Sequence, residues 1–306
     1  MNKIKRYLEA WISHLTLDYG MLQRNEIYRA MIDYLAFADK QKGVDENCET
    51  DVIISLTTFG DRINTVYKTI ESLMMQTMKP KKIVLWVADN ELVMNGGGGK
   101  SIMLNCFEKR GLEILTCEDI RSYKKLIPTL NRYPDSVVIT VDDDVIYPVT
   151  LVEELVKTHK LFPDCVVFNY GKEIVLSKGL PDNYSKWKYV KKHTEPSHQY
   201  IGVGVGGILY PPNCFISDVV SREKFEKLAP YADDIWFKMM ALLNGTKYIE
   251  NQFRHIGSPK DFLKRYITIE DEQTEKLATV NVLNYGNDKQ LNNVLSEYGI
   301  ELNNYW

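Results

Sequence analysis

Three consecutive carboxylates, Asp142, Asp143 and Asp144, follow a run of apolar and β-branched residues at 137–141. Aspartate is a poor strand former, and adjacent like charges repel one another, so we expect a positive partner where this strand ends. In open α/β sheets the ligand crevice lies at the carboxyl ends of the strands. If the strand geometry continues, Asp142 and Asp144 point the same way and can both bind one hard cation through oxygen.

A solvated turn closed by Pro148 is the alternative interpretation of these acids. A plain surface turn does not require a buried strand that leads into three carboxylates. The pattern therefore favours an ion-binding site.

The composition excludes several classes of protein. The chain has 306 residues, 44% of them apolar, which is enough for a full core in one large domain or two small ones. The net charge of −3 gives no global basic field, so nucleic acid is not an expected partner. Five cysteines without CxxC spacing indicate reduced thiols in a cytosolic protein. No apolar run approaches 18 residues, so we expect a cytoplasmic protein that is at most peripheral on a membrane.

Residues 1–45 have apolar side chains at helical spacing, which predicts a helical extension. Its basic start, with Lys3, Lys5 and Arg6, is compatible with an interfacial membrane helix. Glu9 and Asp18 dilute this charge and favour packing against the main domain instead.

From residue 51 onward, predicted strands alternate with predicted helices. This order indicates βαβ units and a mostly parallel sheet with helices on both faces. The expected strands are 52–56, 83–87, 112–115, 137–141 and 165–169, and the expected helices are 63–74, 123–130, 149–160 and 235–243. Segment 180–200, rich in tyrosine, lysine and tryptophan, suits an irregular hairpin or a loop.

Two segments are rich in glycine. Residues 95–100 match neither common phosphate-loop spacing, so we interpret them as a surface loop. Segment 202–212 contains four glycines and ends in two prolines, and its backbone N–H groups could approach a sugar or a phosphate closely. A hairpin turn in the core is the alternative for this second segment.

The order of these features resembles nucleotide-sugar glycosyltransferases of the GT-A fold, over residues 50–257. The acids at 142–144 resemble the family's DxD metal motif, and 204–210 resembles its glycine-rich loop. Ala232-Asp233-Asp234 resembles the xED motif, with aspartate in place of the usual glutamate, and His255 resembles a late histidine that holds metal or diphosphate. The layout suits both inverting family-2-like and retaining exostosin-like enzymes.

This resemblance implies roles for individual residues. The metal, Mn²⁺ or Mg²⁺, would be bound by Asp142, Asp144 and His255, and the catalytic carboxylate would be Asp234 or Asp233. The residues that would bind the donor are Thr57, Thr58, Phe59, Arg62, Asp89, Lys125, Asp142, Asp143, Gly206 and Gly207. A divalent ion would stabilise the charge that develops on the leaving diphosphate, and a carboxylate would accept the proton of the acceptor hydroxyl. For Asp233 and Asp234 the alternative role is capping of a helix, and for His255 it is a structural one.

The resulting prediction is a cytoplasmic glycosyltransferase with a Rossmann-like GT-A domain at 50–257 and a helical tail at 258–306. It would move a sugar from a nucleotide-sugar donor, by default a UDP-sugar, to a glycan or lipid-linked acceptor in bacterial surface polysaccharide synthesis. The sequence leaves the oligomeric state open.

Two other enzyme classes use similar acids. A haloacid-dehalogenase-type phosphatase would use Asp142 as nucleophile and Asp144 as acid/base, but it expects the nucleophile on the first strand of the domain. A nucleotidyltransferase also uses metal-bound aspartates, but it normally has a loop rich in glycine and basic residues after the first strand, which 58–62 matches poorly. A non-catalytic sugar-binding protein would not need so many clustered acids.

Overall fold

The computed structural model describes residues 21–48, 50–94, 102–191, 195–253, 267–269 and 286–306. Its centre is a seven-stranded sheet with the strand order β13-β6-β12-β4-β1-β2-β3. Within this sheet β12 alone is antiparallel to its neighbours, and the other pairs are parallel. The predicted α/β class with a mostly parallel sheet, as in a Rossmann-like GT-A fold, is therefore confirmed. The strands are β1 (Val52–Thr57), β2 (Lys82–Ala88), β3 (Leu112–Cys117), β4 (Val137–Thr140), β6 (Val166–Phe168), β12 (Ile208–Tyr210) and β13 (Tyr248–Glu250).

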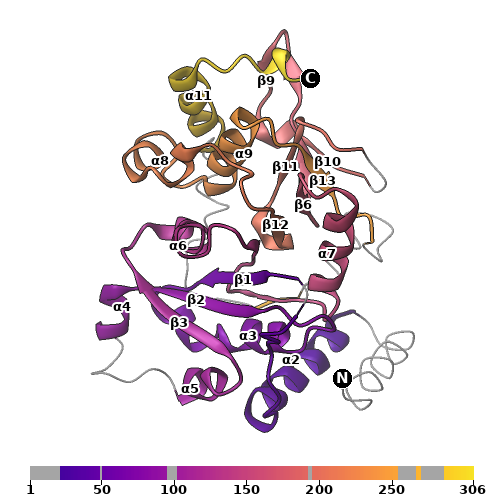
Figure 1. Cartoon of the computed structure of the whole chain (residues 1–306), viewed down its shortest axis with the longest axis vertical. Helices are drawn as coiled ribbons and strands as arrows, with labels where there is room; N and C mark the ends of the chain where they lie inside the picture. The colour runs from indigo at the N-terminus through magenta and orange to yellow at the C-terminus, as the bar shows by residue number, and fades with distance from the viewer. Residues whose placement is uncertain (1–20, 49, 95–101, 192–194, 254–266, 270–285) are drawn as a thin grey trace.

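Helices cover both faces of this sheet because side chains along each strand alternate between the faces. On β1, Ile54 and Leu56 belong to the core with α3 (Tyr67–Met74) and α5 (Ile102–Glu108), below the sheet in Figure 1. Ile53 points to the other face, where the indole of Trp86 donates a hydrogen bond to Thr129 at 2.7 Å. Thr129 lies in α6 (Ile127–Arg132), which follows the short 3-10 helix η2 (Arg121–Lys125).

The second glycine-rich segment contains a strand that the sequence did not reveal. After the turn η4 (Gly204–Gly206), residues 208–210 enter the sheet between β4 and β6 as the antiparallel β12. Gly207 has a φ of +80°, a backbone conformation that favours glycine, and it redirects the chain into the sheet. The three residues that follow are buried, so burial of their side chains stabilises this strand.

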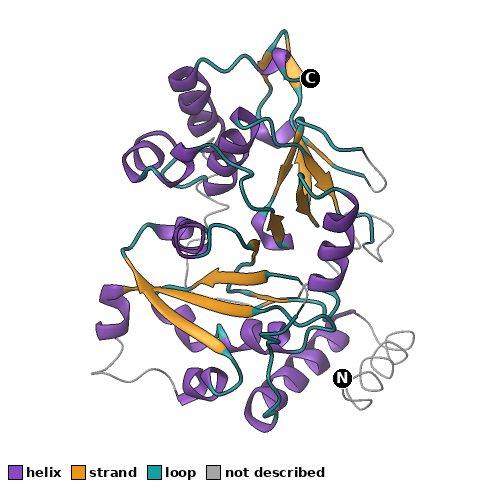
Figure 2. Cartoon of the chain, viewed as in Figure 1, coloured by secondary structure: helices purple, strands orange, loops and turns teal. Residues whose placement is uncertain are grey.

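A second core surrounds one buried helix and is formed mostly by the part of the chain after β6, with Tyr123, Leu126, Ile127 and Val138 from earlier in the chain. Figure 2 shows the helices and strands of the chain by colour. The helix predicted at 235–243 is α9 (Asp233–Leu243), in which Trp236 is completely buried. The C-terminal helix α11 (Gly286–Tyr298) contacts both α9 and α8 (Arg222–Leu228). Within segment 180–200, β10 belongs to a small sheet of order β10-β7-β11, whereas β9 pairs with β8 in a separate two-stranded sheet. The remaining elements here are β7 (Gly171–Glu173), β8 (Leu176–Ser177), β9 (Leu180–Pro181), η3 (Tyr184–Lys186), β10 (Lys188–Tyr189), β11 (Tyr200–Gly202), η5 (Ser217–Val220) and η7 (Leu302–Asn304).

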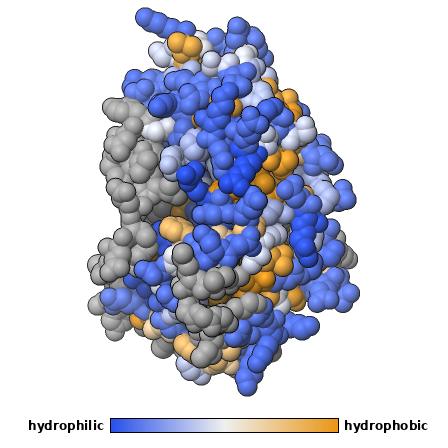
Figure 3. Space-filling model, turned by 90° about the vertical axis from the view of Figure 1, so that its left-hand side faces the viewer, coloured by the Kyte–Doolittle hydropathy of each residue, from blue (hydrophilic) through white to orange (hydrophobic). Residues whose placement is uncertain are grey.

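The described part of the N-terminal extension is α2 (Met21–Ala38), which contacts α3 and α5. The other elements of this half are η1 (Gly60–Asn64), α4 (Asp89–Met94), β5 (Val145–Ile146), α7 (Leu151–Leu161) and β14 (Ile267–Thr268), which pairs with β5. Among the described residues no helix is both long and apolar enough to cross a membrane. The side of the molecule in Figure 3 is largely hydrophilic, with hydrophobic residues in separate patches.

Candidate active site

The three acids lie in the turn between β4 and β5, because regular strand geometry ends at Thr140. The condition that strand geometry continues through Asp144 is therefore not met. The backbone N–H of Asp142 donates to the hydroxyl of Tyr147 at 2.9 Å, and this hydroxyl donates to the carbonyl of Val205 at 3.2 Å. Tyr147, buried and not identified from the sequence, thereby connects the acidic turn to the glycine-rich segment.

Arg62, from η1, binds two of the three acids. Its guanidinium lies 2.9 Å from Asp143 Oδ1 and 3.3 Å from Asp144 Oδ2. Thr58 donates a 2.6 Å hydrogen bond to the other carboxylate oxygen of Asp143. Burial raises the pKa of Asp143, although Arg62 and Thr58 oppose this change. Asp143 is therefore held by the fold and positions Arg62 at the edge of the sheet.

Lys125, at the end of η2, binds the third acid together with the start of α9. Its Nζ lies 3.0 Å from Asp142 Oδ1 and 3.1 Å from Asp233 Oδ2, and its side chain is 9% exposed. Burial alone would lower the pKa of Lys125, but the carboxylates of Asp142, Asp233 and Asp234 together raise it well above the ordinary value. Lys125 is therefore a buried cation that joins elements far apart in the sequence.

Asp234 presents a carboxylate oxygen with an unmet hydrogen-bonding capacity. Its Oδ2 accepts the backbone N–H of Gly204 at 3.1 Å, and its Oδ1 is buried with no hydrogen-bond partner in the described part of the chain. Burial and the neighbouring charge of Asp233 raise the pKa of Asp234 to about 7, while Lys125 opposes the change. The N-cap of α9 is Ala232, without a side-chain cap, so neither acid caps the helix by a hydrogen bond from its side chain.

Gly204 is the glycine at which these charged groups meet. A Cβ atom at this position would lie 2.8 Å from Lys125 Nζ, 3.4 Å from Asp142 Oδ1 and 3.5 Å from Asp234 Oδ1. The sequence-based list named Gly206 and Gly207 instead. In the structure Gly206 accepts a hydrogen bond from the side chain of Asn169, and a Cβ atom on Gly207 would approach Leu151. The close repeat of glycines indicated the segment, but only the fold shows which glycine lies in the site.

The remaining predicted site residues are Thr57, Phe59, Asp89 and His255. Thr57 donates its hydroxyl hydrogen bond to the carbonyl of Trp86 in the neighbouring strand. Phe59 is 43% exposed, and the guanidinium of Arg62 lies 5.1 Å from its ring centroid. Asp89 is exposed at the start of α4. His255 lies outside the described residues.

The charge balance of the turn fits a divalent cation. Burial, and then repulsion from Asp142, raise the pKa of Asp144 to about 6 even though Arg62 is close. The described residues contain no group of three or more histidine, cysteine or acidic side chains arranged to hold a metal ion. A magnesium-type site, however, commonly uses only one or two carboxylates and takes its other ligands from substrate phosphates and water. Asp142 and Asp144, whose side chains are 29% and 35% exposed, can supply such a pair.

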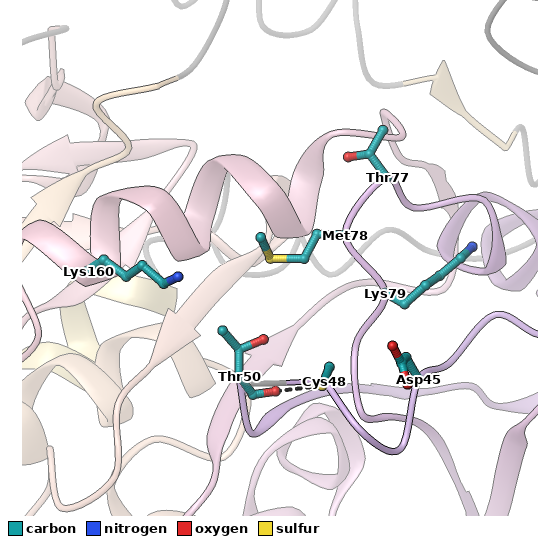
Figure 4. Close-up of a pocket in the computed structure, with 7 residues that line it drawn as sticks. All are labelled: Asp45, Cys48, Thr50, Thr77, Met78, Lys79 and Lys160. Atoms are coloured by element: carbon teal, nitrogen blue, oxygen red, sulfur yellow. Dashed lines mark hydrogen bonds between the residues drawn. The ribbon is translucent and has the colours of Figure 1, made fainter. Parts of the chain in front are cut away.

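Two cavities lie away from these acids. One, of about 320 Å³, is formed around Thr50, which precedes β1, and the hydrogen bond from Cys48 Sγ to the carbonyl of Thr50 is drawn in Figure 4. The other, of about 630 Å³, includes Val137, the first residue of β4. Both therefore lie at the amino ends of strands, whereas ligands of open α/β sheets bind at the carboxyl ends.

No protein-family model matches the chain, and no curated protein matches its sequence. Among solved structures, the mannosyltransferase PcManGT from Pyrobaculum calidifontis, in complex with GDP-Man and Mn²⁺, is similar with a TM-score of 0.46 and 12% identity over 95% of this chain and 75% of that one. A CMP:2-keto-3-deoxy-manno-octonic acid synthetase complexed with CTP is similar with a TM-score of 0.38 and 11% identity over 66% of this chain and 89% of that one. At such scores neither likeness carries an argument about activity, so the function must be argued from the site itself.

Proposed function

We propose that this protein is a metal-dependent glycosyltransferase that uses a nucleotide-sugar donor. The observation that carries the proposal is the junction at Lys125, where the acidic turn after β4, the start of α9 and Gly204 come within contact of one another. The junction lies at the carboxyl edge of the parallel strands, where nucleotides bind in open α/β sheets. It combines cations suited to a diphosphate with a carboxylate suited to an acceptor hydroxyl.

Arg62 and Lys125 supply the protein's own positive charge for the donor. Both are fixed by acids of the turn, so their positions are set before the donor binds. Charge-assisted hydrogen bonds to phosphate oxygens are the strongest that such side chains make. A divalent ion bound by Asp142 and Asp144 would add Lewis-acid stabilisation of the leaving diphosphate.

Asp234 is the proposed general base. In the transfer, the acceptor oxygen forms a bond to the anomeric carbon while the bond from that carbon to the phosphate oxygen breaks, and the diphosphate leaves with the bonding electrons. The proton of the acceptor hydroxyl then goes to Asp234 Oδ1, the buried oxygen without a partner in the described structure. A pKa raised to about 7 suits this role, because a base works best when its pKa lies near the operating pH.

The two rival enzyme classes account for less of the site. A phosphatase with Asp142 as nucleophile leaves Asp233 and Asp234 at the start of α9 without a role. A nucleotidyltransferase would also use metal-bound acids, but it normally has a loop rich in glycine and basic residues after the first strand, and segment 58–62 after β1 has a single basic residue, Arg62. We retain a glycan or lipid-linked acceptor, a UDP-sugar donor and surface polysaccharide synthesis as the finer parts of the proposal.

The proposal is tested by calorimetric titration of nucleoside diphosphates and by turnover of a panel of nucleotide sugars, each with and without Mn²⁺. We expect Asp144→Ala to abolish the Mn²⁺-dependent gain in nucleoside diphosphate affinity. Asp135→Ala is the matched control, because Asp135 is an exposed acid before β4, at the opposite end of that strand. If Asp144→Ala retains the gain, the metal assignment is wrong. If the wild-type protein consumes no nucleotide sugar and binds no nucleoside diphosphate, the proposed function is wrong.

A further inference from the structure

A group of aromatic side chains lies beside the glycine-rich segment. Tyr170 precedes β7, and its carbonyl accepts the N–H of Val203 at 2.8 Å, one residue before Gly204. Tyr189, in β10, is 46% exposed, and its ring centroid lies 5.0 Å from that of Tyr170. We call Tyr170 and Tyr189 the tyrosine platform.

The surrounding structure holds the tyrosine platform in place. Lys172 lies opposite Tyr189 in the ladder between β7 and β10, and its Nζ is 5.5 Å from the ring centroid of Tyr189 and 4.0 Å from that of Tyr184. Tyr184 is buried, and its backbone N–H donates to Asp288 of α11 at 2.6 Å. The C-terminal helix α11 therefore supports the segment that carries Tyr189. These contacts hold the exposed ring of Tyr189 in a defined position.

The tyrosine platform is also close to the proposed base. The backbone N–H of Gly204 donates to Asp234 Oδ2 at 3.1 Å, and the neighbouring N–H of Val203 donates to the carbonyl of Tyr170 at 2.8 Å. The backbone of Tyr170 therefore contacts the residue next to the glycine that Asp234 contacts. Arg62, in contrast, follows β1 and contacts Asp143 and Asp144.

We propose that the tyrosine platform is the acceptor subsite and that the acceptor presents a pyranose ring to it. The C–H face of a pyranose is apolar and packs on an aromatic ring, while its hydroxyls need polar partners, and a pair of tyrosines supplies both. This inference rests on the proposed transferase function and specifies its acceptor as a carbohydrate. Of the other aromatic residues in segment 180–200, Tyr184 and Trp187 are buried and Tyr200 packs against Phe168, so they are not available for stacking.

The test uses saturation-transfer NMR of the full chain with lactose, N,N′-diacetylchitobiose, methyl α-mannopyranoside and methyl β-glucopyranoside as probes. We expect at least one probe to bind, with saturation reaching its ring protons from tyrosine. Tyr189→Ala should weaken this binding about tenfold, as expected for the loss of roughly 60 Å² of apolar contact. Tyr189→Phe keeps the ring and should retain most of the affinity. Tyr34→Ala is the matched control, because Tyr34 is 70% exposed on α2, at the other end of the molecule in Figure 1.

Three results would overturn the inference: no probe binds the wild-type protein, Tyr189→Ala binds as well as the control, or Tyr189→Ala weakens a nucleoside diphosphate by the same factor. The last result would assign the rings to the donor base instead. The nucleoside diphosphate titration also separates this inference from the proposed function. If glycosides bind through Tyr189 while no nucleotide binds, the transferase proposal is wrong and the carbohydrate site remains.

Discussion

Lys125→Met is the substitution that most directly tests the organisation of the candidate site. Methionine keeps much of the length and apolar volume of lysine but removes the charge. In the wild-type protein this charge lies 3.0 Å from Asp142 and 3.1 Å from Asp233. Its removal leaves these acids, with Asp234 beside them, without their nearest cation.

The expected loss of stability follows from the burial of the pair. Removing one partner of a fully buried ion pair costs roughly 3–5 kcal/mol, because the other charge remains without compensation. Here the side chains of Asp142 and Asp233 are 29% and 12% exposed, so water relieves part of that cost. We therefore expect a loss of about 2–3 kcal/mol in the free energy of unfolding.

Urea unfolding at neutral pH measures this loss. With an m-value of about 3 kcal/mol per M, the midpoint should fall by about 0.7–1 M with m unchanged. Lys124→Met is the matched control: the neighbouring lysine has an equally buried stem, but its amine pairs with Asp119, whose side chain is 49% exposed. The control should lose about 1 kcal/mol or less. In the double variant with Asp233→Asn, the losses should be less than additive by about 1–2 kcal/mol.

Equal losses in Lys125→Met and Lys124→Met would refute the reasoning, because the burial of the pair would then have no energetic consequence. Additivity with Asp233→Asn would refute the bridge to α9 in particular. The same variant also affects the donor: its affinity for a nucleoside diphosphate should fall through two effects, the loss of a charge and the loss of order in the acidic turn.

Three further outcomes are expected. Asp234→Asn removes the proposed base, so turnover should fall by about 10²- to 10⁴-fold. The asparagine can still accept the Gly204 N–H, so nucleoside diphosphate affinity and melting temperature should change little. Preserved turnover would instead assign the proton to the leaving diphosphate and indicate a retaining, front-face transfer. Gly204→Ala should impair nucleoside diphosphate binding, because its Cβ displaces the Lys125 amine. Gly207→Ala, at a φ of +80°, should mainly lower the free energy of unfolding, by about 1–3 kcal/mol in a urea titration. Impaired binding in Gly207→Ala and lowered stability alone in Gly204→Ala would contradict the geometry. Burial lowers the pKa of Lys238 in the folded protein to about 7 from an ordinary 10.5, so between these pH values the unfolded chain binds the extra proton and the contribution of Lys238 to stability rises with pH. Lys238→Met should therefore be more stable than the wild type by roughly 2–5 kcal/mol at pH 7, and melting curves should show this gain shrinking toward pH 10. A gain independent of pH would contradict the shift.

The sequence predicted the parts of the fold that depend on local pattern. Short apolar runs gave β1, β2 and β3 to within two residues at each end. For β1 and β2 the reason is that buried parallel strands are continuous in their apolar character, whereas β3 is a partly buried edge strand. It did not predict β12. Glycines dominate that segment, and three apolar residues after a turn carry too little local signal to separate a central strand from a loop.

The candidate site shows the same division between local and tertiary information. The acidic turn was visible because three adjacent charges are unusual at the end of a strand. The partners of each acid were not, because Lys125, Gly204 and Asp233 meet only after the strands and α9 have packed. Tyr147 gave no signal beyond its position in the same turn, yet its hydroxyl connects that turn to the glycine-rich segment.

The arrangement of charge explains why such a costly cluster is compatible with a stable fold. Each half of the site has one cation, with Arg62 between Asp143 and Asp144 and Lys125 between Asp142 and the start of α9. The acids outnumber these cations, and burial together with repulsion from Asp142 raises the pKa of Asp144. A ligand that adds positive charge to the folded state alone must then stabilise it by mass action. Stability and donor binding are therefore linked through the acidic turn, since a divalent cation that relieves the repulsion also prepares the site for a diphosphate.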